Sequence, residues 1–268
     1  MKLIHVLSLF ILAFSGLGHA QSTASAQVST FKIDAPQLHG EKKIWIYLPK
    51  AYSYSDKEYS VIYMHDAQNL FDAETSYVGE WYVDEYLDSI SDAKSIIIGI
   101  EHGNEHRMDE LTPFPNDKYG GGKAEAYLDF IINTLKPQID TTYRTLKDAK
   151  HTTIFGSSLG GLLSFYALIK YPDTFGNAGI FSPSFWFSNR IFDFISETDI
   201  SPNSRFYFLA GSEESEEMVL DQEKMVELLL IKGVPKEHIK NMIIEGGRHN
   251  EVLWQHNFPE AYQWLIEN

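Results

Sequence analysis

Eight short apolar stretches, separated by longer stretches with helical character, constrain the fold of this chain more than any other feature. Several of the short stretches are apolar almost throughout, which is typical of strands buried on both faces of a parallel sheet. They lie at residues 30–33, 43–48, 60–65, 95–100, 152–155, 178–181, 205–209 and 241–244. The helical stretches lie at residues 80–89, 123–135, 159–171, 216–231 and 251–266.

This alternation predicts an α/β fold. No helical stretch separates the first two strands, so we expect an antiparallel hairpin followed by repeated β–α units. The prediction is a mostly parallel, doubly wound sheet of eight strands with helices on both faces. Only residues 182–204 separate the sixth and seventh strands, so any cap over the sheet is small. In such sheets, binding and catalytic side chains follow the C-terminal ends of the strands.

Composition narrows the classes of function. The chain has 268 residues, of which 44% are hydrophobic and 22% charged, as expected for one globular domain. It contains no cysteine, which excludes disulfides, thiolate metal sites and a cysteine nucleophile. The net charge of −15 argues against nucleic acid as a partner, and solubility is its simplest explanation.

The N-terminal residues have the pattern of an export signal. Lys2 precedes the apolar run 3–14, and small residues precede Ala20, which predicts a secretory signal peptide at residues 1–20. The run is shorter than the about 20 apolar residues of a membrane helix, so we expect no stable anchor. Cleavage leaves 21 basic and 37 acidic residues, a net charge of −16. We predict a flexible leader at residues 21–30, one domain at residues 31–268, and a periplasmic or secreted protein.

The segment 156–161, Gly-Ser-Ser-Leu-Gly-Gly, contains the strongest local motif. Ser158 is the centre of a G-x-S-x-G sequence that follows a predicted strand and begins a predicted helix, which is the arrangement of a nucleophile elbow. Average composition produces such a motif by chance in roughly one chain in ten of this length, so the context carries the argument. The alternative is an ordinary helix start capped by serine. We predict Ser158 as a nucleophile and the backbone N–H of Leu159 as an oxyanion donor.

The order of later residues predicts a base and an acid. Only His238, His249 and His256 follow Ser158, and His249 alone lies in a loop directly after the last predicted strand. His249 is therefore the predicted general base. The acid is expected after the strand at 205–209, where Glu214 is the first choice and Glu213 the second. The acidic cluster there could instead favour the start of the next helix through its dipole.

Five motifs together resemble the putative-esterase branch of the α/β-hydrolases. This branch includes enterochelin esterases, S-formylglutathione hydrolases, feruloyl and acetylxylan esterases, and mycolyl transferases. The motifs, within a likeness from about residue 42 to the end, lie at residues 63–72, 139–145, 156–161, 182–186 and 249–254. The resemblance implies a single-domain, exported serine esterase that forms an acyl-enzyme. It also maps the family acid to Glu214 and the second oxyanion donor to the backbone N–H of Gln68, although many relatives have glycine at position 67.

Substrate contacts are predicted near the strand ends. Trp81, Trp186 and Trp254 could stack on a sugar or aryl group, or could simply pack against the protein. Arg107 could contact substrate, or could pair with Glu110 at the surface. The His65-Asp66 and Glu101-His102 pairs match no standard metal-ligand spacing, so we expect neither a metal nor a cofactor.

The expected substrate is a small-molecule or carbohydrate ester, either a siderophore ester or an acyl- or feruloyl-sugar ester. An anionic iron–siderophore complex would need local cations, which are few in this chain. Two other functions stay open. One is acyl transfer with the same triad, and the other is ligand binding by a catalytically silent exported protein.

Overall fold

The computed structural model describes residues 22–266 of the chain. The predicted signal peptide, residues 1–20, lies outside this range. In the described range, no helix has the length and apolar character that a membrane crossing needs.

Eight strands form one sheet in the order β1-β2-β4-β3-β5-β6-β7-β8. The first two strands pair antiparallel, β2 also runs antiparallel to β4, and all other pairs are parallel. The strands are β1 (Val28–Ala35), β2 (Gly40–Tyr47), β3 (Ser60–His65), β4 (Ser95–Ile100), β5 (Thr152–Ser157), β6 (Asn177–Phe181), β7 (Arg205–Gly211) and β8 (Ile239–Ile244). The predicted fold class and the initial hairpin are confirmed.

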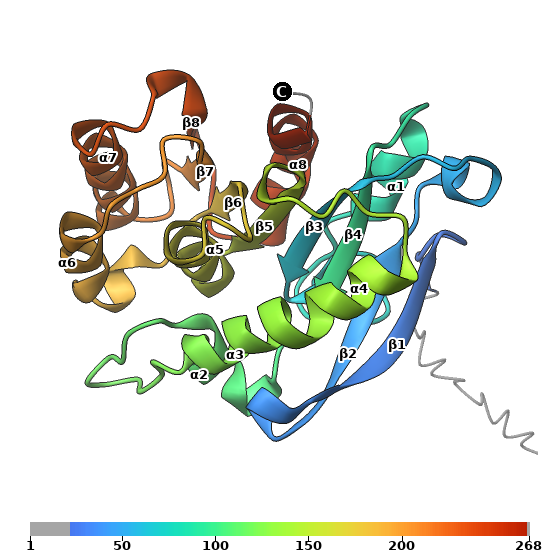
Figure 1. The fold of residues 1–268 in the computed structure, drawn as a ribbon. Coiled ribbons are helices and arrows are strands. Elements are labelled where there is room, and N and C mark those ends of the chain that lie inside the picture. The colour runs from blue at the N-terminus through green and yellow to red at the C-terminus, as the bar shows by residue number, and fades with distance from the viewer. Residues whose placement is uncertain (1–21, 267–268) are drawn as a thin grey trace, which may run out of the picture.

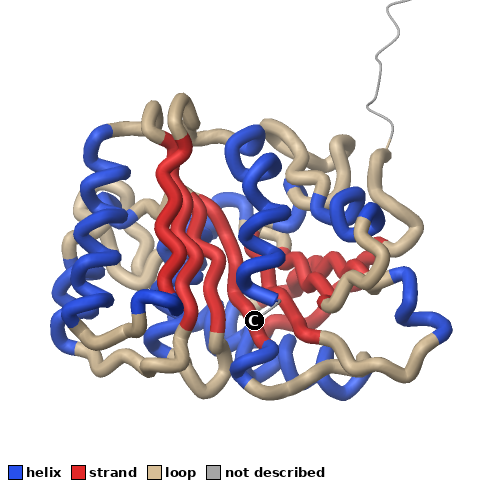
Figure 2. The backbone as a smooth tube through the Cα atoms, turned by 90° about the horizontal axis from the view of Figure 1, so that it is seen from above, coloured by secondary structure: helices blue, strands red, loops and turns tan. Residues whose placement is uncertain are grey.

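Helices cover both faces of the sheet, as Figures 1 and 2 show. They are α1 (Val83–Ser89), α2 (Arg107–Leu111), α3 (Ala124–Phe130), α4 (Lys136–Thr142), α5 (Leu159–Lys170), α6 (Arg190–Glu197), α7 (Glu216–Ile231) and α8 (Glu251–Ile266). Two separate cores result. One lies beneath α3, α5, α6 and α7, and the other lies beneath α1 and α8.

Alternate residues of one strand serve the two cores, because successive side chains of a strand point to opposite faces. In β3, Tyr63 belongs to the core under α5, whereas Ile62 and Met64 belong to the core under α8. All six residues of β3 are buried. This two-sided burial explains why the central strands appear in the sequence as continuous apolar runs.

Two boundaries differ from the predictions. β1 begins at Val28, so the last three residues of the predicted leader belong to the sheet, where they pair with β2. The helix predicted at residues 123–135 continues to Thr142 through a π-helical segment, Ile131–Leu135. Pro137 lies just after that segment and has no N–H to donate, so a change in hydrogen-bond pattern is expected there.

The parallel strands β3 to β8 all present their C-terminal ends at one edge of the sheet. The loops that follow β3, β5, β7 and β8 carry Gln68, Ser158, Glu214 and His249, respectively. The fold therefore brings residues that are up to 181 positions apart to one place.

Candidate active site

Ser158 lies in a strained turn between β5 and α5. Its backbone has φ 57° and ψ −120°, a conformation that costs a non-glycine residue about 1–3 kcal/mol. The Ser158 N–H donates to the carbonyl of Phe181 at 2.9 Å, which ties the turn to β6. A Cβ atom at Gly156 would lie 2.7 Å from the carbonyl carbon of Gly160, so only glycine fits there. This close contact explains why the sequence motif requires glycine at position 156.

Three side chains form one hydrogen-bonded chain at this turn. His249 Nε2 lies 3.0 Å from Ser158 Oγ, and His249 Nδ1 lies 2.7 Å from Glu214 Oε2. A carboxylate can only accept a hydrogen bond, so Nδ1 carries the proton and Nε2 keeps its lone pair toward Ser158. The imidazole is 37% exposed, whereas the Glu214 side chain is 2% exposed. The imidazole is therefore open to solvent and the carboxylate is enclosed.

Glu214 is held by a second set of donors. Its Oε1 accepts from the Ser182 hydroxyl at 2.6 Å and from the Gly211 N–H at 2.8 Å. Ser182 Oγ in turn accepts from Trp254 Nε1 at 2.8 Å. These bonds satisfy a buried carboxylate that would otherwise be costly. In the sequence, Ser182 begins the motif at residues 182–186, but no pattern there indicates that it binds Glu214.

Glu213 points elsewhere. Its carboxylate accepts from Arg248 Nε at 2.7 Å, and both side chains are more than half exposed. Of the two acids that the sequence left open, Glu214 is the one that contacts His249.

A cleft of about 790 Å³ leads to Ser158. The residues that line it include Gln68, Trp81, Arg107 and Trp254, all predicted from the sequence. Gln68 lies in a short 3-10 turn after β3, and Leu159 is the first residue of α5 after β5. Since β3 and β5 are neighbouring parallel strands, the two predicted oxyanion donors flank the same end of the sheet.

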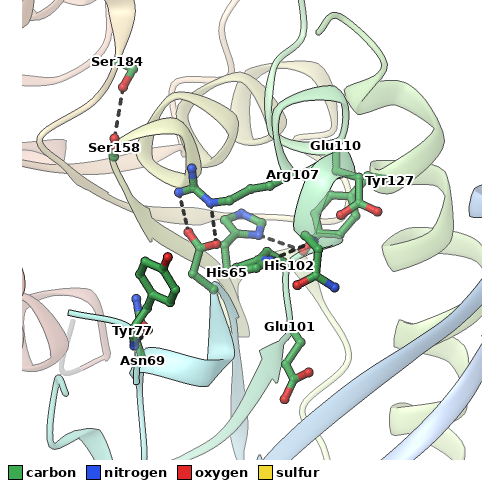
Figure 3. Close-up of polar contacts among 12 residues, drawn as sticks. His65, Asn69, Tyr77, Glu101, His102, Arg107, Glu110, Tyr127, Ser158 and Ser184 are labelled. Carbon is green, nitrogen blue, oxygen red and sulfur yellow. Dashed lines mark hydrogen bonds and ion pairs between the residues drawn. The ribbon is translucent and has the colours of Figure 1, made fainter. Parts of the chain in front are cut away.

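His65 packs beneath the elbow. Its ring is buried, and a Cβ atom at Gly156 would lie 2.8 Å from His65 Cδ2. His65 Nδ1 lies 3.1 Å from the Tyr127 hydroxyl. The hydroxyls of Ser158 and Ser184 lie 3.3 Å apart. Figure 3 marks both contacts with dashed lines. Burial lowers the pKa of His65 to about 4, so the ring is neutral at physiological pH.

Comparison with known proteins assigns the family. Residues 35–265 match the family model described as "Putative esterase". The chain belongs to this esterase family. It is accordingly a carboxylic ester hydrolase by class, and its fold is that of the α/β-hydrolases.

Two curated relatives and one solved structure illustrate the likeness. The uncharacterised protein YbbA of Bacillus subtilis is 29% identical over 240 residues, which are 84% of this chain and 93% of YbbA. The ferri-bacillibactin esterase BesA of the same organism is 44% identical over 63 residues, 24% of this chain and 21% of BesA. An IroE-like serine hydrolase from Shewanella oneidensis superposes with a TM-score of 0.73 at 20% identity, covering 90% of this chain and 80% of that one. At that identity, the superposition shows the fold alone.

Arg107 of the esterase is paired in a way that the sequence did not indicate. Its Nε and Nη2 atoms donate to the two oxygens of Asp66, each at 2.8 Å. Burial opposes ionisation of Asp66, but the Arg107 guanidinium outweighs it and holds the pKa of Asp66 below its usual value. Glu110, the alternative partner, instead accepts from Lys42 at 2.6 Å. Most of the Arg107 charge is thus neutralised within the protein.

The three predicted aromatic contacts have different surroundings. Trp81 is 4% exposed and stacks on Phe181, with ring centroids 5.8 Å apart, so it mainly packs the wall of the cleft. The Trp254 ring lies 5.1 Å from the His249 ring at 85°, which supports the imidazole from one side. Trp186 is 51% exposed, packs edge-on against Tyr119 and is not among the residues that line the cleft.

The close approach of Gly211 to Gly247 generates a test of the site geometry. A methyl group at Gly211 would lie 2.2 Å from the backbone of Gly247, two residues before His249. Gly211→Ala should push this loop away from Glu214 and lower ester hydrolysis by about 100-fold, because shifts near 1 Å have that effect. The measurement is kcat/KM on a p-nitrophenyl ester. Gly40→Ala is the control, since its new methyl would meet no atom within 4 Å. Unchanged activity of Gly211→Ala would contradict this reading of the geometry.

Proposed function

We propose that the protein is a serine esterase in which Ser158, His249 and Glu214 form a catalytic triad. The observation that carries the proposal is the pair of contacts on the imidazole, 3.0 Å to Ser158 Oγ and 2.7 Å to Glu214 Oε2. A buried, doubly hydrogen-bonded carboxylate fixes the tautomer of a solvent-open histidine, and this histidine contacts a hydroxyl on a strained turn. A serine in an ordinary helix start would need none of these features.

In the first half of the proposed reaction, His249 Nε2 takes the Ser158 proton while Oγ attacks the ester carbonyl. The carbonyl electron pair moves to its oxygen, which accepts hydrogen bonds from the N–H groups of Gln68 and Leu159. The tetrahedral intermediate then collapses, its C–O bond to the alcohol breaks, and His249 gives the proton to the leaving alcohol. Ser158 is left as an acyl ester.

Water completes the cycle by the same route. His249 takes a proton from water, the hydroxide oxygen attacks the acyl carbon, and the carboxylic acid leaves as Ser158 regains its proton. The 37% exposure of the His249 side chain favours water as the acceptor, because solvent reaches the base directly. This exposure favours hydrolysis over transfer of the acyl group to a second alcohol.

We place the substrate among siderophore esters first, and among acyl- or feruloyl-sugar esters second. Relatives named as siderophore esterases, from Aspergillus fumigatus and Emericella nidulans, support the first class. The cleft supports the second, since Arg107 is the only arginine or lysine among the described residues that line it, and this charge is already paired with Asp66. A bulky neutral ester suits such a cleft better than a multiply charged anion.

We also propose that the protein is exported, on the pattern of residues 1–20 alone. The N-terminal residue of the protein recovered from its producing cells tests this, and a chain that still begins with Met1 would contradict it.

Loss of the nucleophile should abolish hydrolysis. Ser158→Ala should lower kcat by about 10⁴-fold or more on p-nitrophenyl butyrate, since triad members act as a unit. Ser157→Ala, one residue earlier, is the control and should keep most of the activity. The wild type, assayed on a triscatecholate lactone, a feruloyl sugar and an acetyl sugar with Ser158→Ala as the blank, identifies the preferred ester class. Activity that survives Ser158→Ala would overturn the triad.

Adjacent acids provide a matched test of the acid. Glu214→Gln keeps the shape of the side chain but removes the charge that stabilises the imidazolium, so kcat should fall by about 10²–10⁴-fold. Glu213→Gln removes an exposed carboxylate next to it and should leave kcat close to that of the wild type. Both are measured at saturating substrate across pH 6–9. An equal loss in the two variants, or a larger one in Glu213→Gln, would show that Glu214 is not the acid.

A further inference from the structure

Three carboxylates meet at the start of α1, away from Ser158. Glu80, Asp84 and Glu85 each offer one oxygen to a group whose members all lie within 4.8 Å of one another. Glu80 is 3% exposed and Asp84 is 0% exposed, so this is not a solvated acidic patch. None of the three lines the cleft that leads to Ser158.

These carboxylates lack the partners that buried acids normally have. Each has one buried oxygen without a hydrogen-bond partner, namely Glu80 Oε1, Asp84 Oδ1 and Glu85 Oε2. Within residues 22–266, no lysine, arginine or histidine forms an ion pair with them. Glu110, a buried acid elsewhere in the protein, differs because it is paired with Lys42.

Residues 22–25, here called the N-terminal segment, contact this cluster. The Thr23 hydroxyl donates to Glu80 Oε2 at 2.8 Å, and the Ser25 N–H donates to Asp84 Oδ2 at 2.7 Å. Thr23 Oγ1 also accepts from the Ala73 N–H at 2.8 Å. These contacts hold two of the carboxylates in place by one oxygen each, and the unpartnered oxygen of each is left for another ligand.

We propose that Glu80, Asp84 and Glu85 bind a divalent cation, with Ca²⁺ as the best fit. All three ligands are hard oxygens, which Ca²⁺ prefers, and no histidine or cysteine is present to favour zinc. Oxygens on opposite sides of Ca²⁺, at Ca–O distances of about 2.3–2.6 Å, are up to about 5 Å apart, which agrees with the 4.8 Å limit of the cluster. The hydroxyl of Thr23 and water would complete the coordination.

The cation would link the N-terminal segment to one wall of the cleft. Glu80 adjoins Trp81, and Thr75 and Tyr77 of the preceding loop also line the cleft. A cation at Glu80 would therefore order this loop without touching Ser158 or taking part in ester hydrolysis. The proposal stands independently of the proposed triad.

Binding can be measured on the full chain with Ca²⁺ and with Tb³⁺ as a luminescent substitute. At pH 7.5, Ca²⁺ at 100 times its Kd should raise the unfolding temperature above that in EGTA by about 5–10 °C. Tb³⁺ excited through tryptophan should luminesce, and Ca²⁺ should displace it. Ser158→Ala should bind the cation as the wild type does, which separates this test from that of the triad.

Matched variants assign the effect to the cluster. Asp84→Asn should lose the Ca²⁺ shift, yet unfold in EGTA at or above the wild-type temperature, because an uncompensated buried charge has been removed. Glu85→Gln, which is less buried, is the second variant if Asp84→Asn does not fold. Glu74→Gln removes an exposed acid of the same loop and should keep the full shift. Absence of a Ca²⁺-induced shift of the unfolding temperature in the wild type would overturn the proposal. So would a shift in Asp84→Asn and Glu85→Gln that is as large as that of the wild type.

Discussion

The geometry of the candidate active site depends on the hydrogen bonding of one buried carboxylate, that of Glu214. A carboxylate enclosed by protein needs donors on both oxygens, and here these come from three parts of the chain. The Gly211 N–H and the Ser182 hydroxyl bind one oxygen, and His249 binds the other. Because Trp254 donates to Ser182, the last helix is joined to the same network. Glu214 therefore fixes the relative positions of β6, β7, the loop after β8 and α8.

The parallel sheet makes this network attainable. Each of its partners ends a strand, follows the C-terminal end of a strand, or lies in the first turn of the next helix, so the polar groups gather at one edge. Close backbone approach then sets the spacing, since Gly156 lies against Gly160 at the elbow and Gly211 lies against Gly247 beside the acid. These contacts leave no room for side chains. The distances from His249 to Ser158 and Glu214 follow from backbone packing as much as from the side chains themselves.

Local sequence patterns predicted the fold because the burial of each central strand is visible in its own run of apolar residues. The runs at 60–65 and 95–100 match β3 and β4 residue for residue, since two-sided burial leaves an apolar run with clear ends. Likewise, the chain order of nucleophile, acid and base follows from the order of strands, and it indicated Ser158, Glu214 and His249. The structure brings these three residues into contact, and their roles remain proposals.

Long-range pairing could not be predicted in this way. Nothing near Arg107 in the sequence indicates that its partner is Asp66, 41 positions earlier, rather than Glu110 on the next helical turn. The contact of Trp254 with Ser182 spans 72 positions, so no local pattern indicates that this tryptophan, which was predicted to meet substrate, also packs against His249. The N-terminal segment looked like a leader because its polar residues suit solvent, whereas they bind buried carboxylates of the loop and α1. Each case depends on tertiary packing.

The most direct measurement of the central claim is the site of covalent labelling by a fluorophosphonate. The full, folded chain is treated with the probe and digested with trypsin, and the modified residue is located by tandem mass spectrometry. The peptide of residues 151–170 contains three serines, so fragment ions must distinguish them. A base that activates Ser158 predicts one adduct per chain, on Ser158, and none after unfolding. An adduct on Ser157, on Ser164 or outside this peptide, or no adduct on the folded protein, would contradict the account.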